Sequence, residues 1–389
     1  MLIATLLAFS RCLCAQHADD LLVVVLMVKN EAPVIRETLL PLIEGGINNF
    51  LIFDTGSTDN TIELTEAFFS EHRVSRGIIL QEPFVDFATS RNRALQYAEE
   101  TFPEVCFMLM PDAEWHLHSV QGLLDFCESH RHDTHESYSV RIMDAHLDFY
   151  AQRLIRSHTT ARFVGVVHET LNQVSPHKAP NNIFFELIST DYGSEKSRLR
   201  WLRDRDILLQ ECKRNPHDER LTFYLAQTYA CLDDWSSACW WYERRVGMHG
   251  WDEENFMARY RLAQAYEALG NWNQAACNYL AAHSLRPQRA EPLVALAQHY
   301  WDTREFALAF IFARQAVEIP YPFSDTLFVE KLLYEYTRYD LLGCIAWYVG
   351  AYEIGEKAVR AALSVCSNSV HLQRNLRFYN EKLNQLSQK

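Results

Sequence analysis

The sequence predicts two parts of different fold class: an α/β domain with a doubly wound, mostly parallel sheet, and an all-α array of helical repeats after it. Three observations lead to this prediction. Short apolar runs alternate with helical patterns in the first half of the chain. From about residue 196 the strand signals stop and helical patterns continue. A pattern of alanine and tyrosine then recurs with a period of 34 residues between Ala263 and Ala297, as stacked helix pairs require.

The length and charge of the chain narrow the function classes. Its 389 residues suffice for two domains, and we expect an N-terminal extension at 1–20, the α/β domain at 21–195 and the repeats at 196–389. A formal net charge of -13 argues against nucleic acid or anionic lipid as a partner through bulk charge. No apolar run is long enough to span a bilayer, so we expect no stable membrane span.

The cysteines and the first residues bear on location. The ten cysteines include no C-x-x-C pair, which argues against a zinc ribbon, and their scatter fits reduced thiols in the cytoplasm. The run from Leu2 to Phe9 resembles the apolar part of a signal peptide but lacks a basic flank. We therefore expect a cytoplasmic protein, with export or membrane association through this segment as the alternative.

Four apolar runs in the first half predict buried strands, and amphipathic segments between them predict helices. The predicted strands are Leu21–Val28, Phe50–Phe53, Gly77–Leu80 and Cys106–Met110, and the predicted helices begin near Pro33, span Asp59–Glu71, and span Ala88–Glu100.

Polar and acidic residues follow each of these strands. They are Lys29-Asn30-Glu31 after the first, Asp54–Thr61 after the second, Glu82–Phe87 after the third, and Asp112-Ala113-Glu114 after the fourth. In an open parallel sheet, ligands bind outside the carboxyl ends of the strands. The sequence therefore predicts a ligand site at this one rim.

The second half carries the repeat. Ala226, Ala263, Ala297 and Ala346 each precede, by twelve residues, a second alanine at 238, 275, 309 and 358. Small residues are expected where paired helices cross closely, and aromatic residues such as Tyr242 and Tyr279 fill the gaps between them. This pattern resembles the tetratricopeptide repeat family, with an insertion near Pro320–Asp325.

The polar segments of the first half resemble the inverting family-2 glycosyltransferases of the GT-A fold. The shared motifs are V-K-N-E, D-x-G-S-x-D-x-T, A-x-x-R-N-x-A at Ala88–Ala94, and an acidic pair in which this chain has Asp112 and Glu114. A branch of that family also carries F-x-G-x-V-H-E, here Phe163–Glu169, then D-Y-G-S-x-K-S, here Asp191–Ser197, and tetratricopeptide repeats. The resemblance covers roughly residues 21 to 300.

The resemblance implies a divalent cation, Mn2+ or Mg2+, held by Asp112, Glu114 and His168. The family more often has aspartate where Glu114 stands, but glutamate also binds these ions through oxygen, and imidazole favours Mn2+ over Mg2+. The residues expected to bind the nucleotide sugar are Lys29, Asn30, Glu31, Asp54, Asp86, Arg91, Asp112 and Lys196. The candidates for the general base that takes the acceptor's proton are Asp144, Glu169 and Asp191.

The resemblance implies an inverting transfer of a hexose from a nucleoside-diphosphate sugar, with uridine as the preferred nucleoside. The repeats suit a protein or peptide acceptor, or self-association into an oligomer. The alternative is a protein-interaction scaffold whose transferase domain has decayed, for which Glu114 is the only support. A sugar nucleotidyltransferase would need a glycine-rich loop after the first strand, and Lys29–Ile35 contains no glycine.

Overall fold

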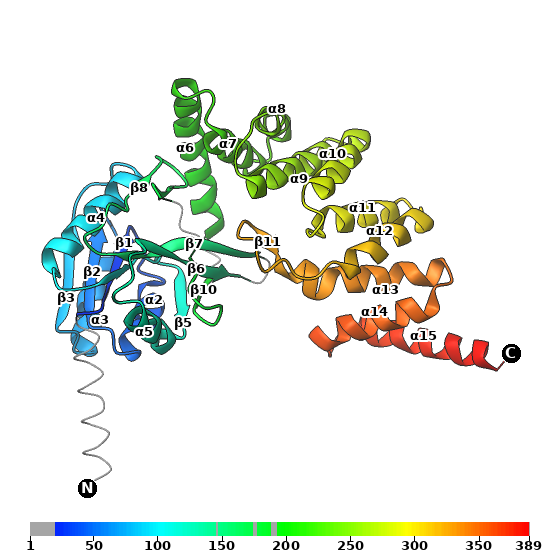
Figure 1. Ribbon diagram of the computed structural model, residues 1–389, viewed down its shortest axis with the longest axis horizontal. Helices are drawn as coiled ribbons and strands as arrows, with labels where there is room; N and C mark the ends of the chain where they lie inside the picture. The colour runs from blue at the N-terminus through cyan, green and yellow to red at the C-terminus, as the bar shows by residue number, and fades with distance from the viewer. Residues whose placement is uncertain (1–19, 145–146, 174–176, 188–192, 389) are drawn as a thin grey trace, which may run out of the picture. The chain divides into compact units, whose positions relative to one another are not determined.

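The computed structural model describes residues 20–144, 147–173, 177–187 and 193–388. For residues 193–197 it describes the backbone only. The chain forms two compact units (Figure 1). The first consists of Met1–Asp144 and Tyr150–Ser194, and the second of Ala145–Phe149 and Glu195–Lys389. Residues 147–149, the described part of the segment 145–149, therefore belong to the helical unit, which the sequence prediction did not foresee. The expected extension at 1–20 lies outside the described residues except for Asp20.

The first unit is built on a mixed sheet with the strand order β3-β2-β1-β4-β7-β6-β10-β5. Its strands are β1 (Leu22–Val28), β2 (Asn49–Asp54), β3 (Arg76–Gln81), β4 (Phe107–Leu109), β5 (Trp115–His118), β6 (Ser137–Met143), β7 (Leu147–Arg156) and β10 (Phe184–Leu187). The strands β3, β2, β1 and β4 are parallel, as predicted. Beyond β4 the sheet changes direction, because β7 pairs antiparallel with β4 and β5 antiparallel with β10.

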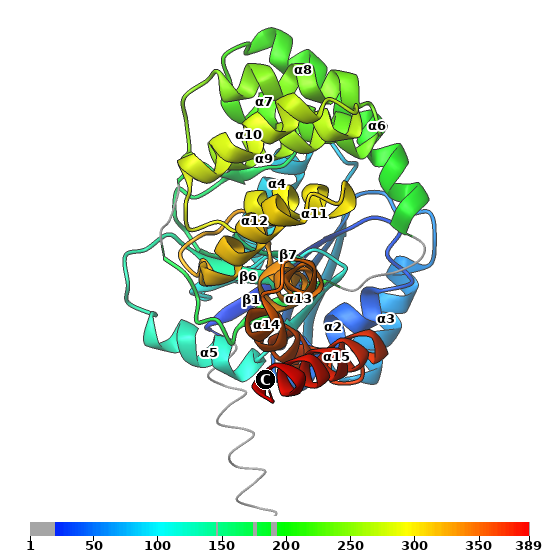
Figure 2. The same cartoon turned by 90° about the vertical axis from the view of Figure 1, so that its right-hand side faces the viewer.

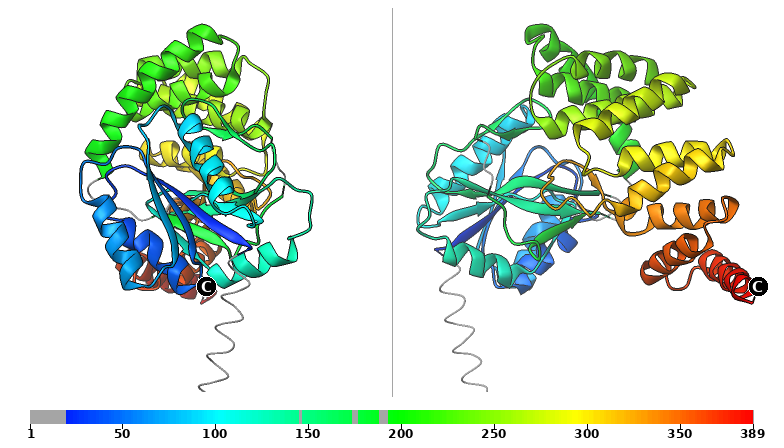
Figure 3. Two further views of the ribbon diagram at one scale, coloured as in Figure 1. Left: turned by 90° about the vertical axis from the view of Figure 1, so that its left-hand side faces the viewer. Right: turned by 45° about the vertical axis from the view of Figure 1, so that its right-hand side comes forward.

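Helices cover both faces of the four parallel strands, which confirms the predicted α/β class. They are α2 (Ile35–Glu44), α3 (Thr61–Glu71), α4 (Phe87–Thr101) and α5 (Val120–Ser129). Figure 3 shows α4 on one side of the strands and α2 with α3 on the other. Leu22 to Leu26 are 0% exposed because β1 is covered on both faces. Ala94, Leu95 and Ala98 of α4 pack against β1 and β2 in one apolar core.

A small hairpin stands beside the main sheet. Its two strands, β8 (Phe163–Val164) and β9 (Thr170–Leu171), pair antiparallel and enclose the loop that ends at Glu169. Phe163 and Leu171 belong to the same core as α4, so the hairpin is fastened to that helix.

The second unit is a succession of helical hairpins (Figure 2). Its helices are α6 (Gly193–Arg214), α7 (Glu219–Cys231), α8 (Trp235–Val246), α9 (Asp252–Ala268), α10 (Trp272–Leu285), α11 (Glu291–Asp302), α12 (Phe306–Glu318), α13 (Arg338–Tyr348), α14 (Tyr352–Val365) and α15 (Val370–Ser387). Each predicted alanine pair lies on the two helices of one hairpin, and all eight alanines are buried. Gly270, with φ +73°, forms the turn between α9 and α10.

Between α12 and α13 lies the insertion that the sequence predicted near Pro320–Asp325. It contains β11 (Val329–Glu330) and the π-helix η1 (Leu333–Thr337). Asp325, 2% exposed, accepts hydrogen bonds from Arg286 at 2.6 Å and from Arg289 at 3.3 Å. Within the same unit, Val329 pairs with Asp148.

Among the described residues, no helix is both long and apolar enough to cross a membrane. The eight cysteines in that part of the chain are all free thiols.

Candidate functional site

The predicted rim is formed by the ends of β1, β2 and β4. Because the three strands are parallel neighbours, the segments after Val28, Asp54 and Leu109 leave the sheet at the same edge. A polar network then connects these segments to one another and to α4.

Asp54 holds the turn after β2. Its side chain is 0% exposed. One carboxylate oxygen, Oδ2, accepts hydrogen bonds from the backbone N–H groups of Gly56 and Ser57 at 3.1 Å and from Gln81 at 3.3 Å. Gly56 has φ +100°, which glycine adopts at no steric cost. Asp54 therefore positions the turn, and its predicted contact with the nucleotide stays a prediction.

Asn30 ties the end of β1 to the same turn. Its side-chain Oδ1 accepts a hydrogen bond from the Thr58 backbone at 2.7 Å, while its own backbone N–H donates to Ser57 Oγ at 2.9 Å. The next residue, Glu31, donates its backbone N–H to Thr61 Oγ1 at 2.8 Å. The V-K-N-E and D-x-G-S-x-D-x-T motifs thus form one interlocked surface, beside which Lys29 is exposed.

Asp59 organises the start of α3. Burial opposes its ionisation, but hydrogen bonds from the Thr61 hydroxyl and backbone, and from the Ala32 backbone, outweigh that cost and lower the pKa of Asp59. A charged carboxylate at a helix N-terminus is also favoured by the helix dipole. The helix begins at Thr61, two residues later than predicted, and Asn60 occupies the cap position.

Two residues fix α4. Asp86 is its N-cap, and its carboxylate accepts hydrogen bonds from the backbone and hydroxyl of Thr89, both at 2.8 Å. Asn92 exchanges two hydrogen bonds of 2.8 Å with the backbone of Phe163 in β8. The asparagine of A-x-x-R-N-x-A therefore holds the hairpin that carries Glu169.

The centre of the site is a cluster of two arginines and two carboxylates, which we call the charge quartet: Arg91, Arg153, Asp112 and Glu169. Arg91 Nη2 lies 2.5 Å from Asp112 Oδ1, and Arg91 Nε lies 2.6 Å from Glu169 Oε1. Arg153 is 3.5 Å from Asp112 Oδ2 and 3.6 Å from Glu169 Oε1. The quartet thus joins α4, β7, the end of β4 and the β8–β9 loop into one electrostatic unit.

Burial makes this quartet unusual. The side chains of Arg91, Arg153 and Glu169 are 4%, 10% and 7% exposed, whereas Asp112 is 32% exposed. Aromatic rings close the inner side, with Phe163 5.5 Å from the Arg91 guanidinium and Trp115 5.2 Å from that of Arg153. Only the Asp112 corner therefore faces solvent to a substantial degree.

The two arginines differ in their electrostatic balance. Burial disfavours the charge on Arg91, but Asp112 and Glu169 outweigh this and raise its pKa. Burial and the neighbouring charge of Arg91 instead lower the pKa of Arg153. Within the described chain, Arg91 Nη1 and Arg153 Nε are buried without a hydrogen-bond acceptor. The site therefore contains two cationic N–H groups with unused hydrogen-bonding capacity.

Of the three predicted metal ligands, Asp112 and Glu114 follow β4, and His168 lies in the loop between β8 and β9. Asp112 is half-buried, and Glu114 and His168 are exposed. Oxygen and imidazole donors suit Mn2+, and a carboxylate that receives two arginine contacts keeps lone pairs for a metal. In the described part of the chain, however, these three ligand atoms do not lie within 4.8 Å of one another. The donor chemistry fits the ion, and binding would require the side chains to approach.

The other predicted residues are placed as follows. Asp144 directly follows β6 and is half-buried. Glu169 is engaged by both arginines, so its carboxylate is occupied in this arrangement. Asp191 lies outside the described residues, and the same holds for the side chain of Lys196 in α6.

Sequence reasoning missed Arg153 and the aromatic lining. Arg153 lies in β7, and the strands after β4 were not predicted. The sequence signal was weak, because Arg153 stands between Gln152 and only two apolar residues, and a second arginine follows at 156. A buried arginine needs carboxylate partners, so the unassigned acids of the first half could have been tested against it.

Comparisons with known proteins give a family match in the first half of the chain and structural similarity in the second. Residues 23–179 match the model of the family described as glycosyl transferase family 2. A comparison with curated proteins finds no match. The helical unit is similar to solved structures, among them the C-terminal part of a TPR repeat-containing protein from Cytophaga hutchinsonii, with 12% identity over 49% of this chain and 69% of that chain and a TM-score of 0.39.

Two further solved structures are similar at the same level. They are MamA, with 17% identity over 44% of this chain and 86% of that chain and a TM-score of 0.35, and BtubC from P. vanneervenii, with 16% identity over 50% and 85% and a TM-score of 0.36.

Proposed function

Because residues 23–179 form a glycosyl transferase family 2 domain, we propose that this protein is a metal-dependent, inverting glycosyltransferase that moves a hexose from a nucleoside-diphosphate sugar, preferably a uridine one. The single observation that carries the proposal is the charge quartet. It fixes Asp112, the first carboxylate of the acidic pair, to α4 and to the loop that contains His168.

The quartet is suited to hold one metal-binding carboxylate in place. Asp112 receives a guanidinium on each oxygen, at 2.5 and 3.5 Å, so its plane is fixed from two sides. A fixed carboxylate lowers the cost of organising the site when donor binds. Glu114 and His168 would complete the ligand set. The bound ion would act as a Lewis acid that offsets the negative charge developing on the leaving nucleoside diphosphate.

The charges of the quartet support a ligand that is itself anionic. Two guanidiniums and two carboxylates cancel, so the buried cluster has no net charge while both arginines are protonated. Arg91 Nη1 and Arg153 Nε are nevertheless unused as donors among the described residues. Because both N–H groups are buried, a phosphate oxygen would reach them only after side chains at the Asp112 corner shift, with a metal neutralising part of its own charge.

For the nucleoside, we propose that the interlocked turn of Asn30, Asp54 and Ser57 forms the wall of the pocket, with Lys29 and Glu31 beside it. The backbone of this wall is held by side-chain hydrogen bonds, so it can recognise a planar base without rearranging. The acceptor's proton would go to a carboxylate base, for which Asp144 and Asp191 remain candidates along with Glu169.

For the acceptor, we propose a protein or peptide bound by the helical repeats, because hairpin arrays present extended surfaces for such partners. We also propose a cytoplasmic location, where nucleotide-sugar donors are made and where the free thiols of the described cysteines persist.

Calorimetric titration of the full chain with UDP, with and without Mn2+, tests the donor site. The proposal expects binding that requires the metal and weakens at least tenfold in Glu114→Ala and in His168→Ala. Glu63→Ala on α3 and His132→Ala are matched controls, because both side chains are exposed and lie outside the rim. Both controls should bind UDP like the parent protein.

The outcomes separate the alternatives. Metal-dependent binding lost in both site variants supports the transferase site, and a screen for donor-sugar hydrolysis then identifies the sugar. Binding that is indifferent to metal contradicts the proposed ligand set. Folded protein that binds neither UDP nor GDP under any metal condition overturns the proposal and favours the interaction scaffold.

A further inference from the structure

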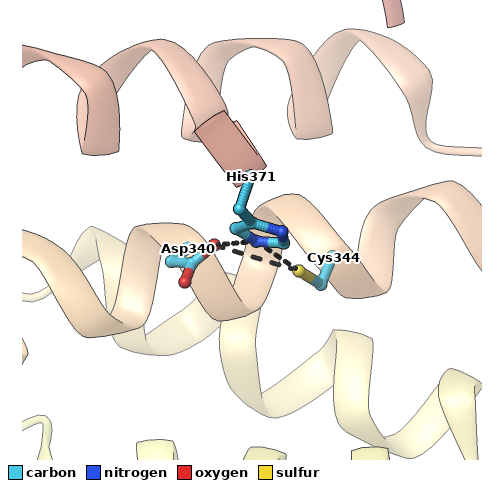
Figure 4. A group of neighbouring side chains, drawn as sticks. All are labelled: Asp340, Cys344 and His371. Carbon is cyan, nitrogen blue, oxygen red and sulfur yellow. Dashed lines mark hydrogen bonds and ion pairs between the residues drawn. The ribbon is translucent and has the colours of Figure 1, made fainter. Parts of the chain in front are cut away.

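A second cluster of side chains that can bind a metal lies in the helical unit, among residues that have no role in the proposed glycosyltransferase site. Among the described residues, Asp340, Cys344 and His371 form the only group of three such side chains whose ligand atoms all lie within 4.8 Å of one another. Figure 4 shows the three side chains converging, two from α13 and one from α15. This cluster is independent of the predicted transferase site.

The spacing along both helices explains the convergence. Asp340 and Cys344 are four residues apart on α13, so they share one face of that helix. His371 and Asn375 are likewise four residues apart on α15. The two pairs face each other, because His371 Nε2 is 3.0 Å from Asp340 Oδ1 and Asn375 Nδ2 is 3.9 Å from Cys344 Sγ.

The distances match those between ligands of one tetrahedral ion. Zinc bonds of about 2.3 Å to sulfur and about 2.0 Å to nitrogen or oxygen place tetrahedral ligand atoms about 3.5 Å apart when one is sulfur, and about 3.3 Å apart otherwise. Here Cys344 Sγ is 3.7 Å from His371 Nε2 and 3.9 Å from Asp340 Oδ1, and the nitrogen–oxygen distance is 3.0 Å. All three edges are within about half an ångström of these values.

The donor set selects the class of ion. A thiolate and an imidazole disfavour Mg2+ and Ca2+, which take oxygen ligands, and suit a borderline-soft ion such as Zn2+. Three protein ligands leave a fourth position for water. Asn375, whose side-chain amide is 3.3 Å from His371 Nε2, could occupy it instead if its oxygen turned inward.

We propose that Asp340, Cys344 and His371 bind a Zn2+ ion that fastens the last helix, α15, to α13. The helices already meet near this point, because the Tyr379 hydroxyl donates a hydrogen bond to the Gly343 carbonyl at 2.7 Å. Two α15 residues, Leu372 and Tyr379, complete a small core with α14. A metal that crosslinks α15 to α13 would stabilise their contact, because an ion held only by the folded state adds its binding free energy to folding.

Cobalt titration of the full chain tests this site. Tetrahedral Co2+ bound by a thiolate shows a near-ultraviolet charge-transfer band that oxygen and nitrogen ligands do not give. The predicted transferase site contains no cysteine, so this band reports the α13–α15 cluster alone. The starting protein should carry Cys277→Ser and Cys366→Ser, which are exposed, together with Cys12→Ser and Cys14→Ser, which lie outside the described residues, because these four thiols could also bind cobalt.

We expect one equivalent of Co2+ to give the thiolate band and Zn2+ to displace it. Cys344→Ser and His371→Gln should each remove the band, whereas His132→Gln, a surface change in the other unit, should leave it unchanged. Hydrogen exchange provides a second readout: at a Zn2+ concentration 100 times the Kd, opening of α15 should become about 100-fold rarer.

Absence of the band from the folded parent protein would overturn the proposal, as would a band of equal strength in Cys344→Ser. If a variant loses the band and its circular dichroism also differs from that of the parent, hydrogen exchange in α7 and α8 shows whether the helical unit is still folded. Protection of these two helices should remain as in the parent. Failure of UDP binding would leave these results untouched, because they depend on no residue of the first unit.

Discussion

The charge quartet predicts that removing one charge from Glu169 will destabilise the first unit strongly. In Glu169→Gln, two buried guanidiniums would share the single carboxylate of Asp112. Breaking a buried ion pair by removing one partner costs about 3–5 kcal/mol, because an uncompensated charge is left behind. Asp112 still compensates one arginine and is 32% exposed, so we expect the lower end, about 3 kcal/mol.

A second change should restore most of this loss. Arg153→Met removes the arginine whose charge is already disfavoured by burial and by Arg91. The double variant Arg153→Met/Glu169→Gln has one arginine and one carboxylate, so its buried charge is balanced again. We expect its stability to return to within about 1 kcal/mol of the parent, since apolar replacement of buried ion pairs is often neutral. The two changes should therefore couple by about 2 kcal/mol or more.

Native-state hydrogen exchange followed by mass spectrometry can measure these effects in the full chain. Peptides from β4 and from residues 150–156 of β7 report the first unit, and peptides from α9 and α10 report the second, which should not change. Tryptophan fluorescence would be less informative, because Trp115 is the only one of nine tryptophans before residue 195. A cost below about 1 kcal/mol for Glu169→Gln, or no recovery in the double variant, would refute the reasoning.

Two further predictions concern one residue in each unit. Asn92→Ala removes both 2.8 Å hydrogen bonds to the Phe163 backbone and should destabilise the β8–β9 hairpin by about 2 kcal/mol, measured as faster hydrogen exchange at 163–171. The control Gln96→Ala, on the exposed face of the same helix, should change the stability of the hairpin by less than about 0.5 kcal/mol. Burial raises the pKa of Glu330 above its ordinary value, so the folded state holds this proton more tightly than the unfolded state. The free energy of unfolding therefore falls as the pH rises from the unfolded-state pKa to the folded-state pKa of this carboxyl. Glu330→Gln, which can still accept the Tyr260 hydrogen bond, should therefore unfold at higher urea than the parent at pH 7.5, and the difference should vanish below about pH 4; an unchanged midpoint at pH 7.5 would contradict this account.

The sequence predicted the features that are periodic or lie close together in the chain. Alanines twelve residues apart, such as Ala263 and Ala275, identified the helix pairs, because close helix crossing tolerates only small side chains. The continuous apolar run of β1 identified a strand covered on both faces. The resemblance of the motifs also selected Arg91, Asp112 and Glu169, and the structure brings these three together.

The sequence could not show the other half of the sheet. The strands β8 and β9 have two residues each, too few for any period to appear. β7 carries Arg153 as a buried charge, and its contacts with Asp112 and Glu169 explain that burial. Such pairing is decided by tertiary contacts rather than by local propensity. The same holds for the α13–α15 cluster, whose members lie on helices separated by α14.

The segment 145–149 has a consequence for how the chain is synthesised and divided. It lies within the sequence of the first unit but pairs through Asp148 with Val329, which leaves the ribosome much later. The hydroxyl of Tyr321 also donates a hydrogen bond to Asp148. During translation Asp148 must therefore wait for Val329 until the insertion between α12 and α13 has emerged. An expression fragment that stops at residue 195 would keep that segment permanently without its partner, and an exposed strand edge of this kind invites association between copies.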